Sequence, residues 1–464
     1  MRRPRRCAGD QLVEIIQTLG AFIVALGILV TIHEYGHFWV ARKTGVKILR
    51  FSVGFGKPIW TTRLGEDETE FTLAAIPLGG YVKMLDEREG EVPDELRHRA
   101  FNTQTLANRT AIVLAGPVAN FLFAILAYWA MYMIGVSGPR PLIGEIQANS
   151  LASAAGLRSG DEITAVNGGA SPTWDNVFRS SVTAILDSSS IELIVADGDG
   201  RERELVLDLG SLSVDDLSRG EFFEKIGFEP YRVPIEPRIG RVIEGDPAAL
   251  AGIQAGDIIV SANGSAIDSW TQWVEYIRGN AGRLIDVGLL RDGDLHKVPL
   301  VPKVFKANGK EIGRIGAEVD VVGVEPVPTG IERYGPLASV PRAFARTGEV
   351  ISTTCKFLRK MVMGEASVEN LSGPISIAHY AGQSAKLGLS RFLDFLGLVS
   401  VSLGILNLLP IPLLDGGHLM YYLLEFALRR PVPESVQLFG QQVGLVLLLG
   451  LMGLAVYNDI MRMM

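Results

Sequence analysis

Long apolar runs lie at the two ends of the chain, whereas the middle alternates apolar and polar positions as a soluble protein does. Four runs are long enough to cross about 30 Å of hydrocarbon as helices of about 20 residues. The third run is longer than a span requires, and Pro410 and Pro412 interrupt it, because proline breaks helical hydrogen bonding. We expect transmembrane helices over residues 19–40, 111–136, 392–428 and 436–457.

The soluble middle contains a duplicated unit. Residues 155–168 and 251–264 match at a constant offset of 96, and Trp174 and Trp270 keep that offset. Both copies contain Ala-Gly-Leu/Ile-x-x-Gly-Asp, then an apolar run and Asn-Gly, which resembles the PDZ fold. PDZ folds commonly bind an extended peptide as an added strand, so peptide capture and a purely steric cap are both open interpretations. We expect two tandem PDZ-like α+β domains over residues 139–232 and 233–325.

Three other segments connect these parts, after an N-terminal segment of residues 1–18. Residues 41–110 have β character, and the stretch 70–76 predicts a hairpin that dips into the membrane and whose edge pairs with substrate. An ordinary cytoplasmic hairpin is the alternative. Residues 326–391 form a helical region in which 334–363 predicts either an interfacial helix or a plain connecting helix.

Composition narrows the function classes. The chain has 464 residues, of which 48% are hydrophobic and 20% charged, and its formal net charge is -7. Such an acidic chain without a dense Lys/Arg stripe excludes nucleic acid as a partner. Cys7 and Cys355 are too few for a disulfide framework. Any strong metal site must therefore use histidines and carboxylates.

The distribution of basic residues predicts the orientation. Basic clusters follow the first span and separate the third from the fourth, so both loops lie on the cytoplasmic side. The repeated domains then lie on the outer side. A basic N-terminus opposes this orientation, and it could also begin a signal peptide, but the first run ends in His-Glu-Tyr-Gly-His without a cleavage site. The clusters are Arg42, Lys43, Lys47 and Arg50, then Arg429 and Arg430, and the opposing residues are Arg2, Arg3, Arg5 and Arg6.

The first span carries a metal-binding motif. His33 and His37 are four positions apart, so both project from one face of a helix and can hold one ion. Glu34 beside them is the type of residue that takes a proton from water instead of ligating. Ionisable residues within a span are costly to bury and mark function.

A tetrahedral site needs a third protein ligand, and the broken third span offers one. Asp415 directly follows the prolines, where irregular backbone is tolerated only inside the protein or beside a cavity. His418 is the alternative ligand or an outer partner of the site. The other histidines, His98, His296 and His379, lie in polar or soluble contexts.

Taken together, these phrases resemble the site-2 protease family, peptidase family M50. His-Glu-Tyr-Gly-His in a first span, Gly116-Pro117-Val-Ala-Asn120 in a second and Asn407 with Leu414-Asp415-Gly416 in a third carry the resemblance. The tandem PDZ-like copies are similar to the proteobacterial branch of that family. Further phrases agree at residues 50–56, 76–84 and 370–374, so the match covers nearly the whole chain.

The resemblance implies a zinc ion held by His33, His37 and Asp415, with Glu34 as general base and Asn407 holding the substrate backbone. It implies a multi-pass α-helical protein of the bacterial inner membrane with four transmembrane helices, a membrane-associated β-hairpin region and periplasmic PDZ-like domains. The active site would lie toward the cytoplasmic side. The implied substrates are the membrane span of a pre-cleaved anti-sigma factor, in an envelope stress response, and remnant signal peptides.

Two other functions compete with intramembrane proteolysis. A non-catalytic membrane scaffold with a structural metal has no use for Glu34 and would close its site with four protein ligands. A transporter using His and Asp for ions predicts repeats among the spans, and the sequence has none.

Overall fold

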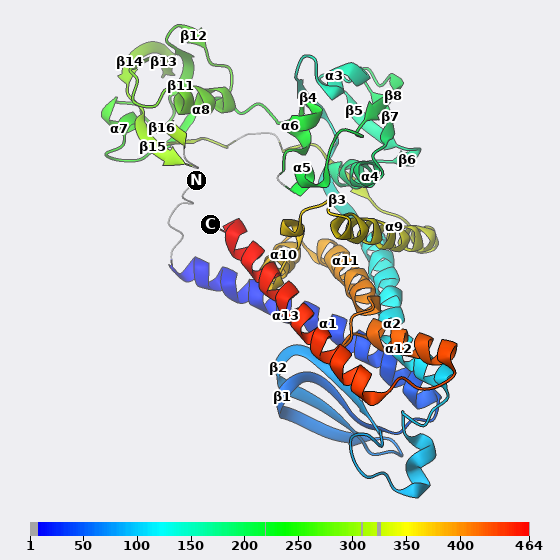
Figure 1. Cartoon of the computed structure of the whole chain (residues 1–464). Helices are drawn as coiled ribbons and strands as arrows, with labels where there is room; N and C mark the ends of the chain where they lie inside the picture. Colours follow the sequence, from blue (N-terminus) through cyan, green and yellow to red (C-terminus); the bar gives the residue numbers. More distant parts are fainter. Residues whose placement is uncertain (1–7, 219, 308–309, 323–325, 464) are drawn as a thin grey trace.

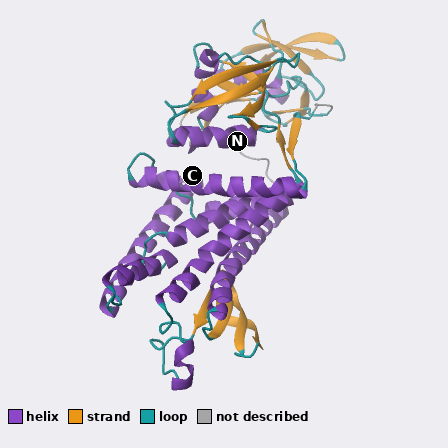
Figure 2. Cartoon of the chain, turned by 90° about the vertical axis from the view of Figure 1, so that its right-hand side faces the viewer, coloured by secondary structure: helices purple, strands orange, loops and turns teal. Residues whose placement is uncertain are grey.

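The computed structural model describes residues 8–218, 220–307, 310–322 and 326–463. The basic N-terminus and Cys7 lie outside these residues, and Cys355 is an exposed free thiol. Long helices form the centre of the molecule, a β-sheet lies at one end of them and two smaller mixed units lie at the other (Figure 1). The side view in Figure 2 shows the same order, with strands at both ends and helices between.

Among the described residues, four helices are long and apolar enough to cross a membrane, and each overlaps one of the four expected spans. The expected third span is two helices, because α11 ends at Leu408 and α12 begins only at Asp415. The two prolines lie in the intervening loop, where no helical hydrogen bond depends on them. The helices of this region are α1 Ala8–Lys43, α2 Leu106–Ile134, α10 Pro374–Lys386, α11 Leu389–Leu408, α12 Asp415–Leu428 and α13 Glu434–Met463, with the short 3-10 helices η1 Asp94–Arg99 and η2 Val368–Asn370.

Strands β1 (Ile48–Leu64) and β2 (Thr69–Met84) form the sheet beside the end of α1. Both strands bend, so residues 50–53 pair with 80–83 on one side and with 70–73 on the other. Residues 70–73 also pair with 60–63. The expected hairpin exists, and residues 70–73 lie inside its sheet because they have partners on both sides. The edges of the sheet are residues 58–64 and 80–84.

Two mixed units repeat one topology. The first has a sheet of order β6-β5-β7-β8 and the second a sheet of order β12-β11-β13-β14. The first contains β3 Val136–Pro139, β4 Ile143–Ile146, α3 Leu151–Ala155, β5 Glu162–Val166, β6 Gly169–Ala170, α4 Trp174–Leu186, β7 Ser190–Ala196, β8 Glu202–Asp208, α5 Val214–Ser218, α6 Phe222–Ile226 and β9 Phe228–Pro230. The second contains β10 Ile239–Val242, α7 Pro247–Leu250, β11 Ile258–Ala262, β12 Ser265–Ala266, α8 Trp270–Gly279, β13 Ile285–Arg291, β14 Asp294–Leu300, β15 Lys303–Ala307, β16 Lys310–Arg314 and β17 Ala317–Val319.

The repeated Gly-Asp phrase has a structural reason. Asp161 and Asp257 are 2% and 1% exposed, and each accepts hydrogen bonds from an arginine on a strand of its own unit. Arg203 donates to Asp161 and Arg291 to Asp257, at 2.7 Å in both units. A buried carboxylate needs such a partner, and each unit supplies one.

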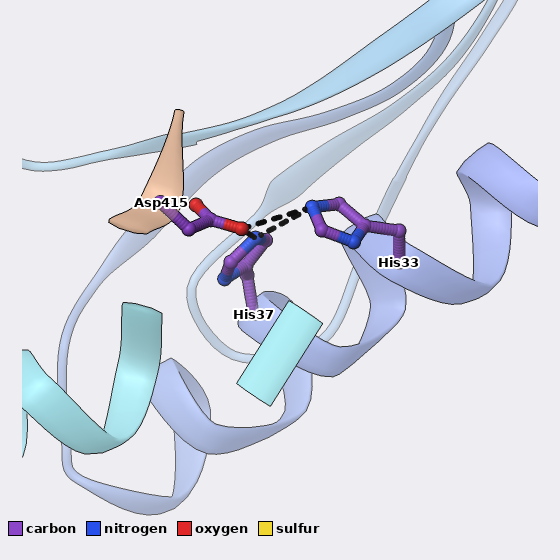
Figure 3. Close-up of side chains that lie close together, drawn as sticks. All are labelled: His33, His37 and Asp415. Carbon is purple, nitrogen blue, oxygen red and sulfur yellow. Dashed lines mark hydrogen bonds and ion pairs between the residues drawn. The ribbon is translucent and has the colours of Figure 1, made fainter. Parts of the chain in front are cut away.

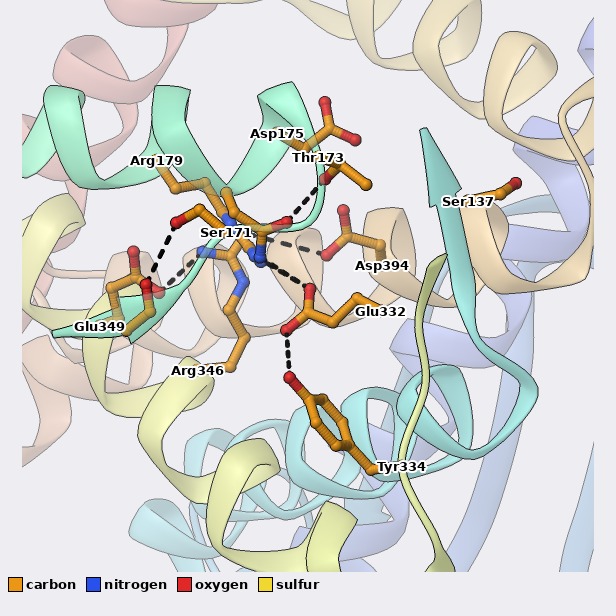
Figure 4. A network of polar contacts seen from close by, with 12 residues as sticks. Ser137, Ser171, Thr173, Asp175, Arg179, Glu332, Tyr334, Arg346, Glu349 and Asp394 are labelled. Carbon is orange, nitrogen blue, oxygen red and sulfur yellow. Dashed lines mark hydrogen bonds and ion pairs between the residues drawn. The ribbon is translucent and has the colours of Figure 1, made fainter. Parts of the chain in front are cut away.

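A polar network joins the first unit to the long helices (Figure 4). Glu332 at the end of β18 (Thr329–Glu332) is 9% exposed and accepts from Asn176 at 2.9 Å and Arg179 at 3.3 Å, both on α4. Arg391 of α11 forms an ion pair with Asp175 of α4. Helix α9 (Pro336–Val362) packs against α2, α11 and α4, so it lies between the first unit and the spans.

Candidate metal centre

Three ligand-type side chains converge although they lie far apart in the sequence. His33 and His37 project from one face of α1, and Asp415 comes from the first turn of α12 (Figure 3). The Asp415 Oδ2 atom lies 3.2 Å from His33 Nε2 and 3.5 Å from His37 Nε2. The two Nε2 atoms are 3.2 Å apart. The three side chains are only 11% to 17% exposed.

This triangle fits a tetrahedral metal ion. Zinc bonds of about 2.0–2.2 Å in tetrahedral geometry place neighbouring ligand atoms about 3.3–3.6 Å apart. The observed edges of 3.2, 3.2 and 3.5 Å agree with that spacing. It is the one group of three such ligands found among the described residues, and three protein ligands leave the fourth position open.

The loop before α12 places Asp415. Residues 409–414 fold back onto the first turn of α12, so closely that a Cβ on Gly416 would lie 2.1 Å from the Leu409 carbonyl oxygen. Leu413 has a φ of 98°, a strained conformation for a bulky residue. Strain of this kind persists only where the surroundings over-determine it, and it clusters at functional sites.

Helix α2 supports the histidines from behind. The Nδ1 atom of His37 lies 2.8 Å from the Ile112 carbonyl oxygen, and that of His33 lies 3.2 Å from the side chain of Asn120. Such outer contacts fix the orientation of a ligating imidazole. Sequence reasoning assigned Asn120 no role, although its four-residue spacing from Gly116 puts both residues on one face of α2.

Gly116 permits the close approach of α1 and α2. A Cβ on this residue would lie 2.3 Å from His37 Nε2 and 2.8 Å from His33 Cε1. We therefore expect Gly116→Ala to lower metal affinity by about 10–100-fold, as when the surroundings of ligating histidines are disturbed. Competition with a chelator measures this. Gly20→Ala on α1, where nothing lies within 4 Å of the new Cβ, is the matched control. Equal affinities for both variants would contradict the expectation.

A cavity of about 320 Å³ adjoins the metal centre. Glu34, His37 and Asp415 line it together with residues 82–84 of β2. His418, the alternative third ligand, also lines this cavity but is not part of the ligand triangle. Asn407 is half-buried near the end of α11 and is not among the described residues that line the cavity.

Comparisons with known proteins agree with this geometry. A model described as Peptidase family M50 matches residues 21–451. "Regulator of sigma-E protease RseP" of Escherichia coli (strain K12) is 43% identical over 454 residues, which cover 97% of this chain and 100% of that protein. A "Putative zinc metalloprotease" of Vibrio cholerae is 42% identical over the same shares. The solution structure of GtR34C from Geobacillus thermodenitrificans is 32% identical over 17% of this chain and 90% of that chain, with a TM-score of 0.15.

Long apolar helices around a His-His-Asp triangle, with a glutamate in the adjoining cavity, define a metallopeptidase built into a membrane-type helical fold. The family match makes the assignment specific. This chain belongs to peptidase family M50. It is a zinc metalloprotease of the site-2 class, and the resemblance recognised in its sequence is confirmed.

Proposed function

We propose that this protein cleaves the transmembrane segments of other proteins, with zinc held by His33 Nε2, His37 Nε2 and Asp415 Oδ2. The observation that carries the proposal is the triangle of ligand atoms 3.2–3.5 Å apart beside a cavity that Glu34 also lines. Three protein ligands favour catalysis over a structural role, since structural zinc sites close with four. A scaffold with a structural metal is accordingly the weaker candidate.

The zinc ligands and Glu34 have different roles in the proposed reaction. When bound, zinc supplies a Lewis acid that polarises water and the peptide carbonyl. The Glu34 carboxylate takes a proton from the attacking water and returns it to the leaving amine nitrogen as the peptide bond breaks. The three ligands would hold the ion beside the cavity that Glu34 lines.

We further propose that the substrate is held as an extended strand. A helix hides its carbonyl groups in internal hydrogen bonds, so a membrane span must unwind and find new partners before it is cut. Residues 80–84 of β2 are a sheet edge, and 82–84 line the cavity with Glu34. Strand addition at this edge replaces the lost hydrogen bonds. In this proposal Asn407 holds the substrate backbone on the other side.

This arrangement predicts a cross-linking pattern. A photoreactive amino acid at Lys83, on the edge that lines the cavity, is expected to cross-link to a membrane-spanning substrate in the Glu34→Gln background. The same group at Arg63, which lies on the opposite edge and is 63% exposed, is the matched control and is expected not to do so. Denaturing gels of the irradiated mixture measure both. Stronger cross-linking at position 63 would contradict the assignment of the edge.

Exposed apolar side chains on the sheet support its immersion in the membrane. They gather where β1 bends, and water-soluble sheets rarely expose such a group. We propose that this end of the sheet dips into the bilayer beside α1. The side chains are Phe55, Ile59, Trp60, Leu73 and Ile76, which are 43% to 69% exposed.

The two repeated units are proposed to be PDZ-like domains that select substrates. Their shared strand order supports this, and the second unit has a largely apolar groove of about 400 Å³ between α8 and residues 312–319. Trp270, Trp273 and Ile277 line the groove, which is wide enough for an apolar peptide segment. The groove favours peptide capture by the second unit. In this proposal the two units together also restrict the access of large substrates.

The proposed location is the bacterial inner membrane, with the repeated units in the periplasm and the metal centre toward the cytoplasm. The contact between Arg109 at the start of α2 and Glu425 near the end of α12, at 2.7 Å, supports a common side for the basic loops after α1 and α12. The proposed substrates are a pre-cleaved anti-sigma factor and remnant signal peptides. The name of the Escherichia coli relative, a regulator of sigma-E, supports the first.

The test is cleavage of a single-span substrate by the purified chain in lipid vesicles. We expect two fragments separated within the span, loss of cleavage with a zinc chelator and recovery when zinc is restored, because the Lewis acid is indispensable. Mass spectrometry of the fragments locates the cut. Cleavage that persists in chelator at zero bound zinc would refute the proposal.

A further inference from the structure

The second ring nitrogen of His33 faces a side chain that no part of the reaction above uses. Asn120 on α2 is fully buried, at 0% exposure, and its amide nitrogen Nδ2 lies 3.2 Å from His33 Nδ1. The Oδ1 atom of Asn120 has no hydrogen-bond partner among the described residues. A buried polar side chain placed this way needs an explanation, since such groups are normally satisfied.

The chemistry of a ligating imidazole supplies the explanation. A neutral histidine that offers the Nε2 lone pair to a metal carries its hydrogen on Nδ1, and that N–H must find an acceptor. The carboxamide of Asn120 is the group within hydrogen-bond distance of His33 Nδ1. Its two ends have nearly the same shape, and rotating the amide by about 180° exchanges the donor for the acceptor.

We propose that Asn120 is a positioning residue for the zinc centre, whose Oδ1 accepts the Nδ1–H of His33 when the metal is bound. This inference rests on the proposed zinc site and extends it to α2. The Ile112 carbonyl oxygen, 2.8 Å from His37 Nδ1, does the same for the other histidine. One helix therefore sets the tautomer and the ring orientation of both imidazole ligands.

Two further features lie around the backbone of Asn120. The Ser400 hydroxyl of α11 donates to the Asn120 backbone oxygen at 2.8 Å, and Ser400 is also fully buried. Gly116 lets this face of α2 approach α1 without a side chain between them. Because the Asn120 side chain is fully buried, packing fixes its carboxamide before the metal binds, which is the condition for an outer group to orient a ligand.

The variants separate hydrogen bonding from packing. Asn120→Leu keeps the volume and removes the acceptor. Asn120→Asp keeps an acceptor of the same shape, and carboxylates are common partners of zinc-bound histidines. Ser400→Ala is the matched control, because it disturbs the same buried contact region without touching the His33 ring.

The measurement is zinc affinity of the full-length protein in detergent, from competition with a chelator. We expect Asn120→Leu to bind zinc about 10–100-fold more weakly, the usual effect of losing such a partner. Asn120→Asp and Ser400→Ala are expected to bind zinc nearly as well as the unmodified chain. Cobalt substitution adds a spectroscopic readout, and only Asn120→Leu should shift the absorption bands that report ligand geometry.

Three results would overturn the proposal: undiminished zinc affinity in Asn120→Leu, an equal loss in Asn120→Asp, or an equal loss in Ser400→Ala. If Asn120→Leu does not fold, Asn120→Ala serves in the same competition. Because affinity is measured without turnover, the outcome is independent of the cleavage assay. A chain that binds zinc as expected but cuts nothing would refute the proposed function and leave this inference standing.

Discussion

Glu34→Gln is expected to lower the rate of cleavage by about 10²–10⁴-fold, the usual contribution of a general base. Glutamine has nearly the shape of glutamate but cannot take a proton from water. Glu34 does not belong to the ligand triangle, so the variant should still bind zinc with full affinity. Initial cleavage rates in vesicles, together with zinc content, measure the two expectations.

Glu275→Gln makes the same chemical change at an exposed position of α8 and is expected to leave the rate unaltered. Comparable rates for the Glu34 and Glu275 variants would refute the base assignment. Loss of zinc from Glu34→Gln would instead mean that Glu34 is a ligand. The ligand set of His33, His37 and Asp415 would then be incomplete.

The sequence predicted features with a local physical signature. The first, second and fourth expected spans are continuous apolar runs, and such a run has few other stable conformations in a chain of this type. The histidine motif needs only the four-residue periodicity of one helix. The duplicated units were visible because turn residues and a buried Asp recur at a fixed offset, and each Asp now has an arginine partner.

Features that depend on contacts between distant parts of the chain could not be predicted from the sequence. The stretch 70–76 has the composition of a strand, but only the bend in β1 determines that it lies inside the sheet and that 80–84 is the edge beside Glu34. The contact between Asn120 and His33 spans 87 positions and depends on how closely α1 and α2 pack. In the sequence, Gly116 stands out only as part of a motif. The structure gives the reason for a glycine there, because a Cβ at this position would collide with the rings of His33 and His37.

The third ligand is the part of the site where sequence reasoning left two candidates. Asp415 and His418 lie one turn apart on α12, so both face the same cavity. Only Asp415 has an atom within 3.5 Å of both histidine nitrogens. A carboxylate also offsets part of the charge of a dication held between apolar helices, which a neutral imidazole cannot do.

Asp415→Ala is therefore expected to lower zinc affinity by more than the roughly 10–100-fold that loss of an outer partner costs, and to abolish cleavage. Asp415→Asn keeps an oxygen ligand without the charge, so its zinc affinity should lie between those of Asp415→Ala and the unmodified chain. Zinc content after equilibration with graded chelator concentrations ranks the variants.

His418→Ala is the decisive comparison, because it removes the rival side chain from the same cavity and the same helix. It should retain zinc, since no edge of the ligand triangle involves it. Retention of zinc by Asp415→Ala, with loss in His418→Ala, would transfer the third position to the histidine. The 3.2 and 3.5 Å distances argue against that result, because His418 lies about 4.5 Å further along the axis of α12, and a shift of ligand would require the helix to slide by that distance.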